Sequence, residues 1–149
     1  MTQHLLIDTD PGIDDALAIL MAAQHPEAEI AALTITAGNV GLNHTVEAPI
    51  YPGAQMPLVT AQEDAAHVHG QDGFGDIGYA RASRQAANEH AVLAMLRLSR
   101  ERPNGLTFVM LGPLTNLALA LSLDPALPQR VSRLVIMGGA VTGHGNIRI

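Results

Sequence analysis

Four aspartates lie within eight residues near the N-terminus, in the stretch "LLIDTDPGIDDALAIL": Asp8, Asp10, Asp14 and Asp15. Burying like charges without a partner is costly. The chain contains no lysine, and its first arginine is Arg81, so no side chain close in sequence can neutralise these carboxylates. A divalent cation can do so, and a site built from oxygen ligands favours Mg²⁺ or Ca²⁺. The spacing therefore predicts a metal site.

A purely structural role is the alternative for some of these acids. Asp10 before Pro11 is typical of a helix start, with Asp10 as the N-cap and Pro11 as the first helical residue. An N-cap aspartate contributes about 1 kcal/mol, and an acid in the first turn gains about 0.3–1 kcal/mol from the helix dipole. However, Asp10 and Asp14 stand four residues apart and repel by a few tenths of a kcal/mol. A metal site accounts for the four together better than a cap does.

The acids lie in a strand-helix-strand pattern. Residues 4–8 form an apolar run typical of a buried strand, and residues 30–36 form a second, β-branched run. The helix predicted between them carries Ile13, Leu17, Leu20 and Met21 on one face and ends near His25-Pro26. Two parallel strands joined by a helical crossover are the usual result.

The remaining segments continue this alternation. The pattern predicts a short strand around "PIYPGAQMPLV", a helix over residues 85–100, a strand at 106–111, a helix opened by "GPLTNLALAL" and a strand at 133–140. The predicted fold class is α/β, an open, mostly parallel sheet with helices on both faces. Such sheets bind ligands beyond the carboxyl ends of their strands. Polar and glycine residues should therefore converge there: 8–10, 36–39, 111–113 and 137–139.

Composition narrows the class of protein. The chain has 149 residues, a net charge of −6 and no cysteine, which predicts a single α/β domain over residues 1–149 without disulfides. Its eight basic residues are scattered arginines, which argues against a nucleic-acid surface. No apolar run approaches the roughly 20 residues that span a bilayer, and the N-terminus lacks a basic secretory-signal region. We expect a cytoplasmic protein without nucleic-acid or membrane partners.

Two classes of protein with acids after a first strand fit the residues less well. Haloacid dehalogenase-like phosphatases carry threonine or valine two residues after the second aspartate, where this chain has Gly12, and they need a lysine further on. Response-regulator receiver domains also need a lysine. Because the chain contains none, both alternatives lose their required cation.

The segment "DTDPGIDDALAI" closely resembles the N-terminal signature of the inosine-uridine-preferring nucleoside hydrolases. Four more segments continue the resemblance in the family's order: "TITAGNVGLNHT", "VHGQDGFGD", "LGPLTNLALAL" and "LVIMGGAVTGHGN". The resemblance covers nearly the whole chain. It implies a Rossmann-like α/β fold and Ca²⁺-dependent hydrolysis of the N-glycosidic bond of ribonucleosides, with release of ribose and free base. A small-molecule nucleoside is the implied substrate, and a homo-oligomer is expected for the full-length protein.

The resemblance also assigns roles to residues of the acidic segment. Asp10 and Asp15 match the carboxylates that bind Ca²⁺, and the backbone carbonyl of Leu111 matches a further ligand. Asp14 matches the general base, which also contacts the substrate. Asp8 is an acid of the motif with a supporting role.

Three residues outside the acidic segment complete the implied site. Asn39 matches the asparagine that binds the ribose, and Met137 matches a methionine that lines the ribose pocket. His69 lies where some family members place a histidine near the leaving base, so it is a candidate catalytic residue. A solvated loop histidine is the alternative for His69.

The chain departs from the family in two places. A family helix is missing where Glu47-Ala48-Pro49 joins the flanking segments, and the family's C-terminal half, which adds ribose contacts and a Ca²⁺ ligand, has no counterpart here. The chain is therefore expected to be the N-terminal part of a larger nucleoside hydrolase domain. The alternative is a catalytically inactive, truncated remnant that binds ribose or metal. In either case we expect the 149-residue chain alone to bind Ca²⁺ weakly and to hydrolyse nucleosides negligibly.

Overall fold

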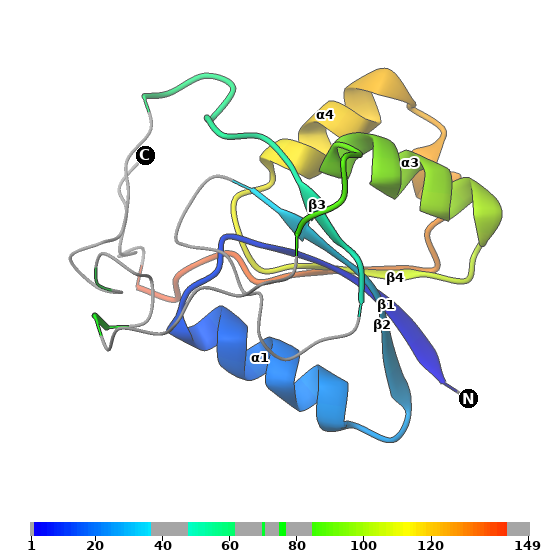
Figure 1. Cartoon of the computed structure of the whole chain (residues 1–149). Helices are drawn as coiled ribbons and strands as arrows, with labels where there is room; N and C mark the ends of the chain where they lie inside the picture. Colours follow the sequence, from blue (N-terminus) through cyan, green and yellow to red (C-terminus); the bar gives the residue numbers. More distant parts are fainter. Residues whose placement is uncertain (1, 37–47, 62–69, 71–74, 77–84, 143–149) are drawn as a thin grey trace.

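A five-stranded, fully parallel sheet forms the centre of the molecule, with helices on both of its faces (Figure 1). The computed structural model describes residues 2–36, 48–61, 70, 75–76 and 85–142. The strand order is β3-β2-β1-β4-β5, so the N-terminal strand lies in the middle of the sheet. The predicted fold class is confirmed.

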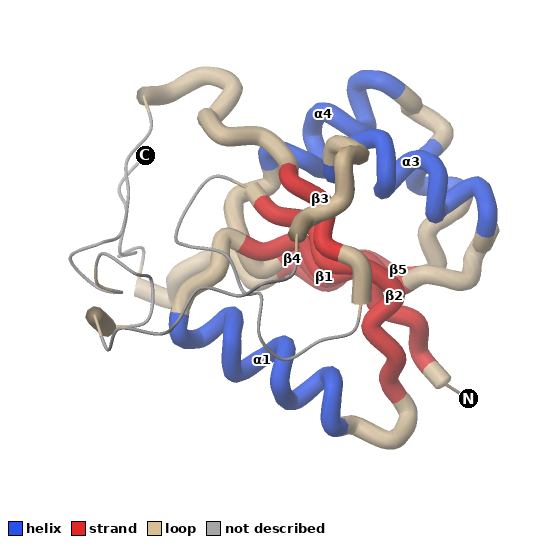
Figure 2. The backbone as a smooth tube through the Cα atoms, in the orientation of Figure 1, coloured by secondary structure: helices blue, strands red, loops and turns tan. Residues whose placement is uncertain are grey.

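The elements follow the chain in the predicted alternation of strand and helix (Figure 2). Their bounds are β1 Gln3–Thr9, α1 Ile13–Gln24, β2 Ala28–Ile35, β3 Ile50–Pro52, α3 Ala91–Glu101, β4 Thr107–Met110, α4 Thr115–Leu123, the 3₁₀ helix η1 Leu127–Gln129 and β5 Arg133–Ile136. Among the described residues, no helix is both long enough and apolar enough to cross a bilayer.

The direction of each crossover explains which face each helix covers. The chain passes from β1 to β2 on one side of the sheet through α1, whereas the connections to β4 and β5 run the opposite way and contain α3 and α4. Parallel crossovers are right-handed in about 98% of cases, so a reversal of direction places the helix on the opposite face. Figure 1 accordingly shows α1 on one face and α3 with α4 on the other.

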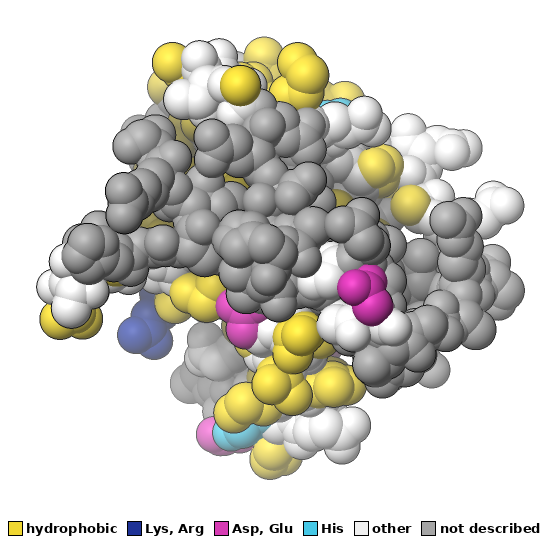
Figure 3. All heavy atoms as spheres, turned by 90° about the vertical axis from the view of Figure 1, so that its left-hand side faces the viewer, with side chains coloured by type: hydrophobic (Ala, Val, Ile, Leu, Met, Phe, Trp, Pro, Cys, Tyr) yellow, Lys and Arg dark blue, Asp and Glu magenta, His cyan; other side chains and the backbone are white. Residues whose placement is uncertain are grey.

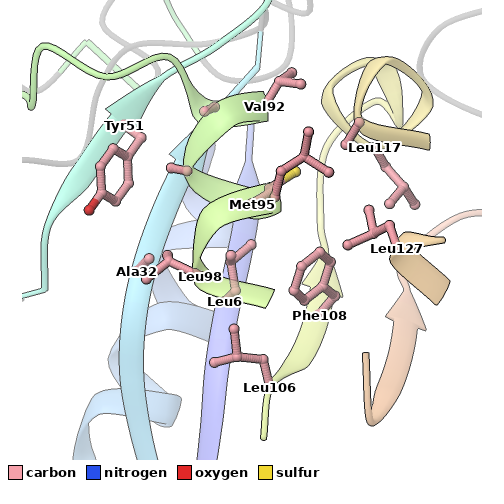
Figure 4. Close-up of a cluster of buried hydrophobic side chains, with 14 of the residues drawn as sticks. Leu6, Ala32, Tyr51, Val92, Met95, Leu98, Leu106, Phe108, Leu117 and Leu127 are labelled. Atoms are coloured by element: carbon pink, nitrogen blue, oxygen red, sulfur yellow. The ribbon is translucent and has the colours of Figure 1, made fainter. Parts of the chain in front are cut away.

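The larger core lies between the sheet and the α3–α4 pair. Leu6 and Phe108 point from neighbouring strands towards Met95 of α3, and all three are fully buried (Figure 4). The smaller core lies under α1 and joins Ile7 and Leu33 of the sheet to Ile19. Alternate residues of β1 thus face opposite cores, as expected for a strand buried on both faces.

Two predicted helix starts were wrong. Helix α1 begins at Ile13 with Gly12 as its N-cap, so Asp10 is not the cap. The backbone N–H of Gly12 donates a hydrogen bond to the Asp15 carboxylate at 3.2 Å. The helix therefore begins two residues later than predicted. Helix α3 begins at Ala91 rather than near residue 85, because the His90 side chain caps it by accepting a hydrogen bond from the Val92 N–H at 3.2 Å.

The apolar stripe of α1 faces solvent among the described residues. Leu17 and Met21 are 58% and 75% exposed, whereas Ile19 on the same helix is 1% exposed. The stripe does lie on one face of the helix, as predicted, but it is not the face that packs on the sheet. Apolar side chains of β5 are also exposed, including Leu134 and Ile136. Both surfaces are apolar enough to serve as contact surfaces.

This arrangement predicts opposite outcomes for two truncations on α1. Ile19→Ala leaves a cavity in the smaller core and should lower the free energy of unfolding by about 2–5 kcal/mol. Leu17→Ala, two residues away, should change it by no more than about 0.5 kcal/mol. Urea unfolding followed by circular dichroism measures both. A larger loss for Leu17→Ala than for Ile19→Ala would show that the helix faces are assigned the wrong way round.

Candidate functional site

The carboxyl ends of four strands are joined side by side by backbone hydrogen bonds. The N–H of Thr36 donates to the Thr9 carbonyl at 3.0 Å, and the N–H of Leu111 donates to the Asp8 carbonyl at 2.8 Å. The Met137 N–H donates to the Met110 carbonyl at 2.8 Å. These bonds bring the described parts of the predicted segments to one edge of the sheet. Figure 3 looks onto this side of the molecule and shows acidic side chains at its surface.

Asp15 is held in place from two directions. Its Oδ1 accepts a hydrogen bond from the Thr9 hydroxyl at 2.6 Å, and its Oδ2 accepts one from the Gly12 N–H at 3.2 Å. Thr9 is fully buried and Asp15 is 4% exposed. Burial raises the pKa of Asp15, and the Thr9 hydrogen bond partly offsets this rise. The first turn of α1 is thereby fixed to the end of β1.

The Asp8 side chain lies on the face of the sheet opposite to Asp15 and is also held by hydrogen bonds. Its Oδ1 accepts hydrogen bonds from the Thr34 hydroxyl at 2.5 Å and from Asn116 Nδ2 at 2.9 Å. Asn116 Nδ2 also donates to the Ile35 carbonyl at 3.0 Å, while its Oδ1 accepts from the Ala54 N–H at 2.9 Å. Within the described part of the chain, Asp8 Oδ2 is buried without a hydrogen-bond partner. Burial raises the pKa of Asp8 to about 6 despite the two hydrogen bonds.

Asp10 lies between these two anchored residues and is half-buried. Burial, and after it the negative charges of Asp15, Asp14 and Asp8, together raise the pKa of Asp10 to about 7, with Asp15 contributing most among the neighbouring acids. A carboxylate in this position is costly to keep ionised at neutral pH without a counter-charge. The electrostatics predicted from the sequence are therefore present in the fold.

Gly112 brings backbone into contact with Asp10. A Cβ atom at this position would lie 2.7 Å from Asp10 Oδ1 and 2.9 Å from Thr36 Cγ2, both too close for a side chain. Because only glycine allows this approach, the turn that follows β4 packs directly against the Asp10 carboxylate. Leu111, whose carbonyl was predicted to be a ligand, is the residue before Gly112.

These features fit a hard cation better than any other counter-charge in the described structure. The described arginines that form ion pairs are Arg97, Arg100 and Arg130. They bind Glu89 just before α3, Glu101 at the end of α3 and Asp124, the residue that follows α4. No group of three or more acidic or histidine side chains capable of holding a metal occurs among the described residues. The predicted set of Asp10, Asp15 and one backbone carbonyl contains only two such side chains. Two carboxylates and a carbonyl are ligands that Ca²⁺ accepts.

The other predicted residues fall into two groups. Asp14 is exposed in the first turn of α1, and Met137 is 50% exposed directly after β5. Asn39 and His69 lie outside the described residues. The structure thus places the acids and Met137 on one edge of the sheet, and the proposed roles of Asn39 and His69 stay predictions.

Sequence reasoning overlooked three residues that organise the site: Thr9, Asn116 and Gly112. Thr9 follows Asp8 directly, so the alternation of side chains along a strand points it towards α1, which carries Asp15. Asn116 lies in the segment predicted to open a helix, but its bond to Asp8 spans 108 positions of sequence. A glycine after a strand, such as Gly112, indicates a turn or a close approach of the backbone in general. It does not indicate which residue the backbone approaches.

The sequence matches a family of known proteins over nearly its whole length. The family model described as "Inosine-uridine preferring nucleoside hydrolase" matches residues 5–149. The chain belongs to this family. It is 41% identical to a non-specific ribonucleoside hydrolase RihC of Escherichia coli O1:K1 in an alignment of 158 residues. That alignment is longer than the chain, so part of the relative lies opposite a gap.

Solved structures show the same fold. A purine-preferring ribonucleoside hydrolase from Gardnerella vaginalis superposes with a TM-score of 0.85 at 32% identity, covering 93% of this chain and 49% of that one. An inosine-guanosine nucleoside hydrolase superposes with a TM-score of 0.82 at 35% identity, covering 98% of this chain and 50% of that one. The RihC match covers 98% of this chain and 52% of the relative. The chain therefore spans about half the length of the proteins it matches.

The close approach at Gly112 predicts that a single methyl group impairs metal binding. Gly112→Ala places a Cβ within 2.7 Å of Asp10 Oδ1, so the carboxylate or the turn must move. We expect Ca²⁺ affinity, measured by isothermal titration calorimetry, to fall at least about tenfold. This is the lower end of the loss of about 10–100-fold that is typical when the groups around a metal ligand are changed. Gly138→Ala is the control, because among the described residues its Cβ would meet only a methyl group of Ile136, at 3.2 Å. Unchanged affinity in Gly112→Ala would argue against Asp10 as a ligand.

The raised pKa values predict a pH dependence of stability with a definite sign. Asp8 and Asp10 have folded-state pKa values of about 6 and about 7, against an ordinary value of 3.8. At pH values between the ordinary and the raised pKa, the folded chain therefore binds more protons than the unfolded chain. Their contribution to the free energy of unfolding is therefore fully present below the ordinary value of 3.8 and is lost progressively as the pH rises from there through the two folded-state values.

Thermal unfolding in EDTA at pH 5.5 and pH 8 measures this effect. We expect the melting temperature to fall from pH 5.5 to pH 8, and Asp10→Asn to reduce the fall, which isolates the contribution of Asp10. Ca²⁺ at pH 8 should restore the loss, because a bound cation favours the ionised carboxylates. A wild-type chain that becomes more stable from pH 5.5 to pH 8, with no change in slope in Asp10→Asn, would contradict the prediction.

Proposed function

We propose that this chain is the N-terminal part of a larger domain that hydrolyses the N-glycosidic bond of ribonucleosides with the help of Ca²⁺. The observation that carries the proposal is the packing of the Gly112 turn against a half-buried Asp10, whose pKa is raised by burial and by neighbouring acids. In a chain of the nucleoside hydrolase family, this arrangement supports a cation site at the substrate edge of the sheet. The products are ribose and the free base.

Asp10, Asp15 and the Leu111 carbonyl would hold the Ca²⁺ ion. An ion bound there would lower the pKa of a water molecule and help to orient the sugar. The two carboxylates differ in how firmly they are fixed. Asp15 accepts hydrogen bonds on both oxygens, whereas the position of Asp10 is limited by the Gly112 backbone.

Asp14 is proposed as the general base. It is adjacent in sequence to Asp15 and exposed in the same first turn of α1, so its carboxylate is free of the bonds that fix Asp15. Cleavage of an N-glycosidic bond passes through an oxocarbenium-like sugar, and a base that removes a proton from the attacking water assists this step. Asp14 would take that proton. Asp8 would serve in support, since its bonds to Thr34 and Asn116 fix the end of β1.

Asn39 and Met137 are proposed to contact the ribose, and His69 to act near the leaving base. Met137 directly follows β5, next to the Met110 end of β4, and half of its surface is exposed. The assignments of Asn39 and His69 rest on the family resemblance. A cytoplasmic location and assembly into a homo-oligomer complete the proposal, and light scattering of the natural-length protein tests the second.

The proposed base predicts a large loss of activity from one amide substitution. In the natural-length protein, Asp14→Asn should lower kcat for inosine or uridine by about 10²–10⁴-fold, the usual contribution of a general base. Its melting temperature should stay unchanged because the side chain is exposed. Release of free base is measured by liquid chromatography, with and without EDTA.

Glu101→Gln is the matched control, because it makes the same chemical change at an exposed acid on α3. It should retain wild-type turnover. Wild-type turnover in Asp14→Asn or in EDTA would overturn the mechanism. Binding of Ca²⁺ and ribose by the natural-length protein without release of base would favour the inactive remnant instead.

A further inference from the structure

We propose that Thr9 is a positioning residue for the cation site, which orients the Asp15 carboxylate from the end of β1. This inference rests on the proposed function, because it assigns Asp15 as a ligand. Thr9 would touch neither substrate nor ion. It would act through Asp15 alone.

The contact itself is short and shielded from water. The Thr9 hydroxyl donates to Asp15 Oδ1 at 2.6 Å, with Thr9 fully buried and Asp15 4% exposed. A hydrogen bond to an ionised acceptor is stronger than one between neutral groups. The bond also fixes the rotation of the carboxylate, because Oδ2 is held at the same time by the Gly12 N–H.

The position of Thr9 makes it suited to this role. As a β-branched residue within β1 it has few side-chain rotamers, so its hydroxyl is preset towards α1. Its backbone is fixed as well, since the Thr9 carbonyl accepts from the Thr36 N–H at 3.0 Å. Asp10 is the next residue of the chain. Thr9 therefore links the two proposed carboxylate ligands, one by a peptide bond and the other by a hydrogen bond.

The consequence is a site organised before the ion binds. Groups that orient a metal ligand typically contribute a factor of about 10–100 to metal affinity. A hydroxyl that merely stabilised the fold would instead change the free energy of unfolding and leave the affinity of the folded protein unaltered. The two roles can be separated by measuring both quantities.

Thr9→Val and Thr9→Ser test the proposal. Valine keeps the shape of threonine and removes the hydroxyl, while serine keeps the hydroxyl. Ca²⁺ affinity is measured by isothermal titration calorimetry on the natural-length protein, and urea unfolding in EDTA reports stability. We expect Thr9→Val to weaken Ca²⁺ binding about 10–100-fold and Thr9→Ser to stay within about threefold of wild type, a rescue expected when the retained hydroxyl makes the same bond.

Thr107→Val is the matched control. Thr107 is also buried, at the opposite end of the sheet, and its hydroxyl makes only a 3.5 Å contact with Gln3. It should leave Ca²⁺ affinity unchanged. Thr9→Ala also removes the hydroxyl and introduces a smaller side chain than valine. It is measured alongside, so that the affinity can still be compared if Thr9→Val does not fold.

The outcomes separate the inference from the proposed function. If wild type binds Ca²⁺ and both Thr9→Val and Thr9→Ala bind it within twofold of wild type, the positioning role is wrong while the cation site stands. If wild type itself binds no Ca²⁺, the proposed function fails first. Equal losses of Ca²⁺ affinity in Thr9→Val and Thr9→Ser would also overturn the inference, because the loss would then not depend on the presence of the hydroxyl.

Discussion

The end of β1 is anchored to a helix on each face of the sheet, and the candidate site depends on this double attachment. Asp8 faces α4 and binds Asn116, whereas Thr9 faces α1 and binds Asp15. Consecutive side chains of a strand point to opposite faces, so two neighbouring residues can fix both helices. Asp10 follows directly, and its carboxylate meets the Gly112 backbone. The position of the acidic cluster is thus a consequence of strand geometry.

The same attachment makes it costly to keep the carboxyl groups of the cluster ionised. Asp8 and Asp15 are buried and Asp10 is half-buried, and burial raises the pKa of each. Hydrogen bonds from Thr34, Asn116 and Thr9 offset part of this cost, but they bring no positive charge. A cation bound by oxygen ligands would remove the remaining penalty. The fold thus concentrates negative charge at the point where we propose the metal site.

The sequence predicted the sheet well because its apolar runs and polar strand ends are local signals. It misplaced the start of α1, since Asp10-Pro11 has the composition of a cap while the Asp15 carboxylate actually binds the Gly12 N–H. It also could not show that Leu17 faces solvent, because periodicity identifies an apolar face without identifying what covers it. The Asn116–Asp8 bond joins residues 108 positions apart, and no local pattern reports such a contact.

The central claim is that a cation binds between the end of β1, the start of α1 and the turn after β4. A crystal structure of the natural-length protein grown with Ca²⁺ tests it most directly, with anomalous scattering used to identify the ion. The account predicts one ion in contact with carboxylate oxygens of Asp10 and Asp15 and with the Leu111 carbonyl. Well-ordered carboxylates with no ion between them, or an ion bound only elsewhere, would contradict it.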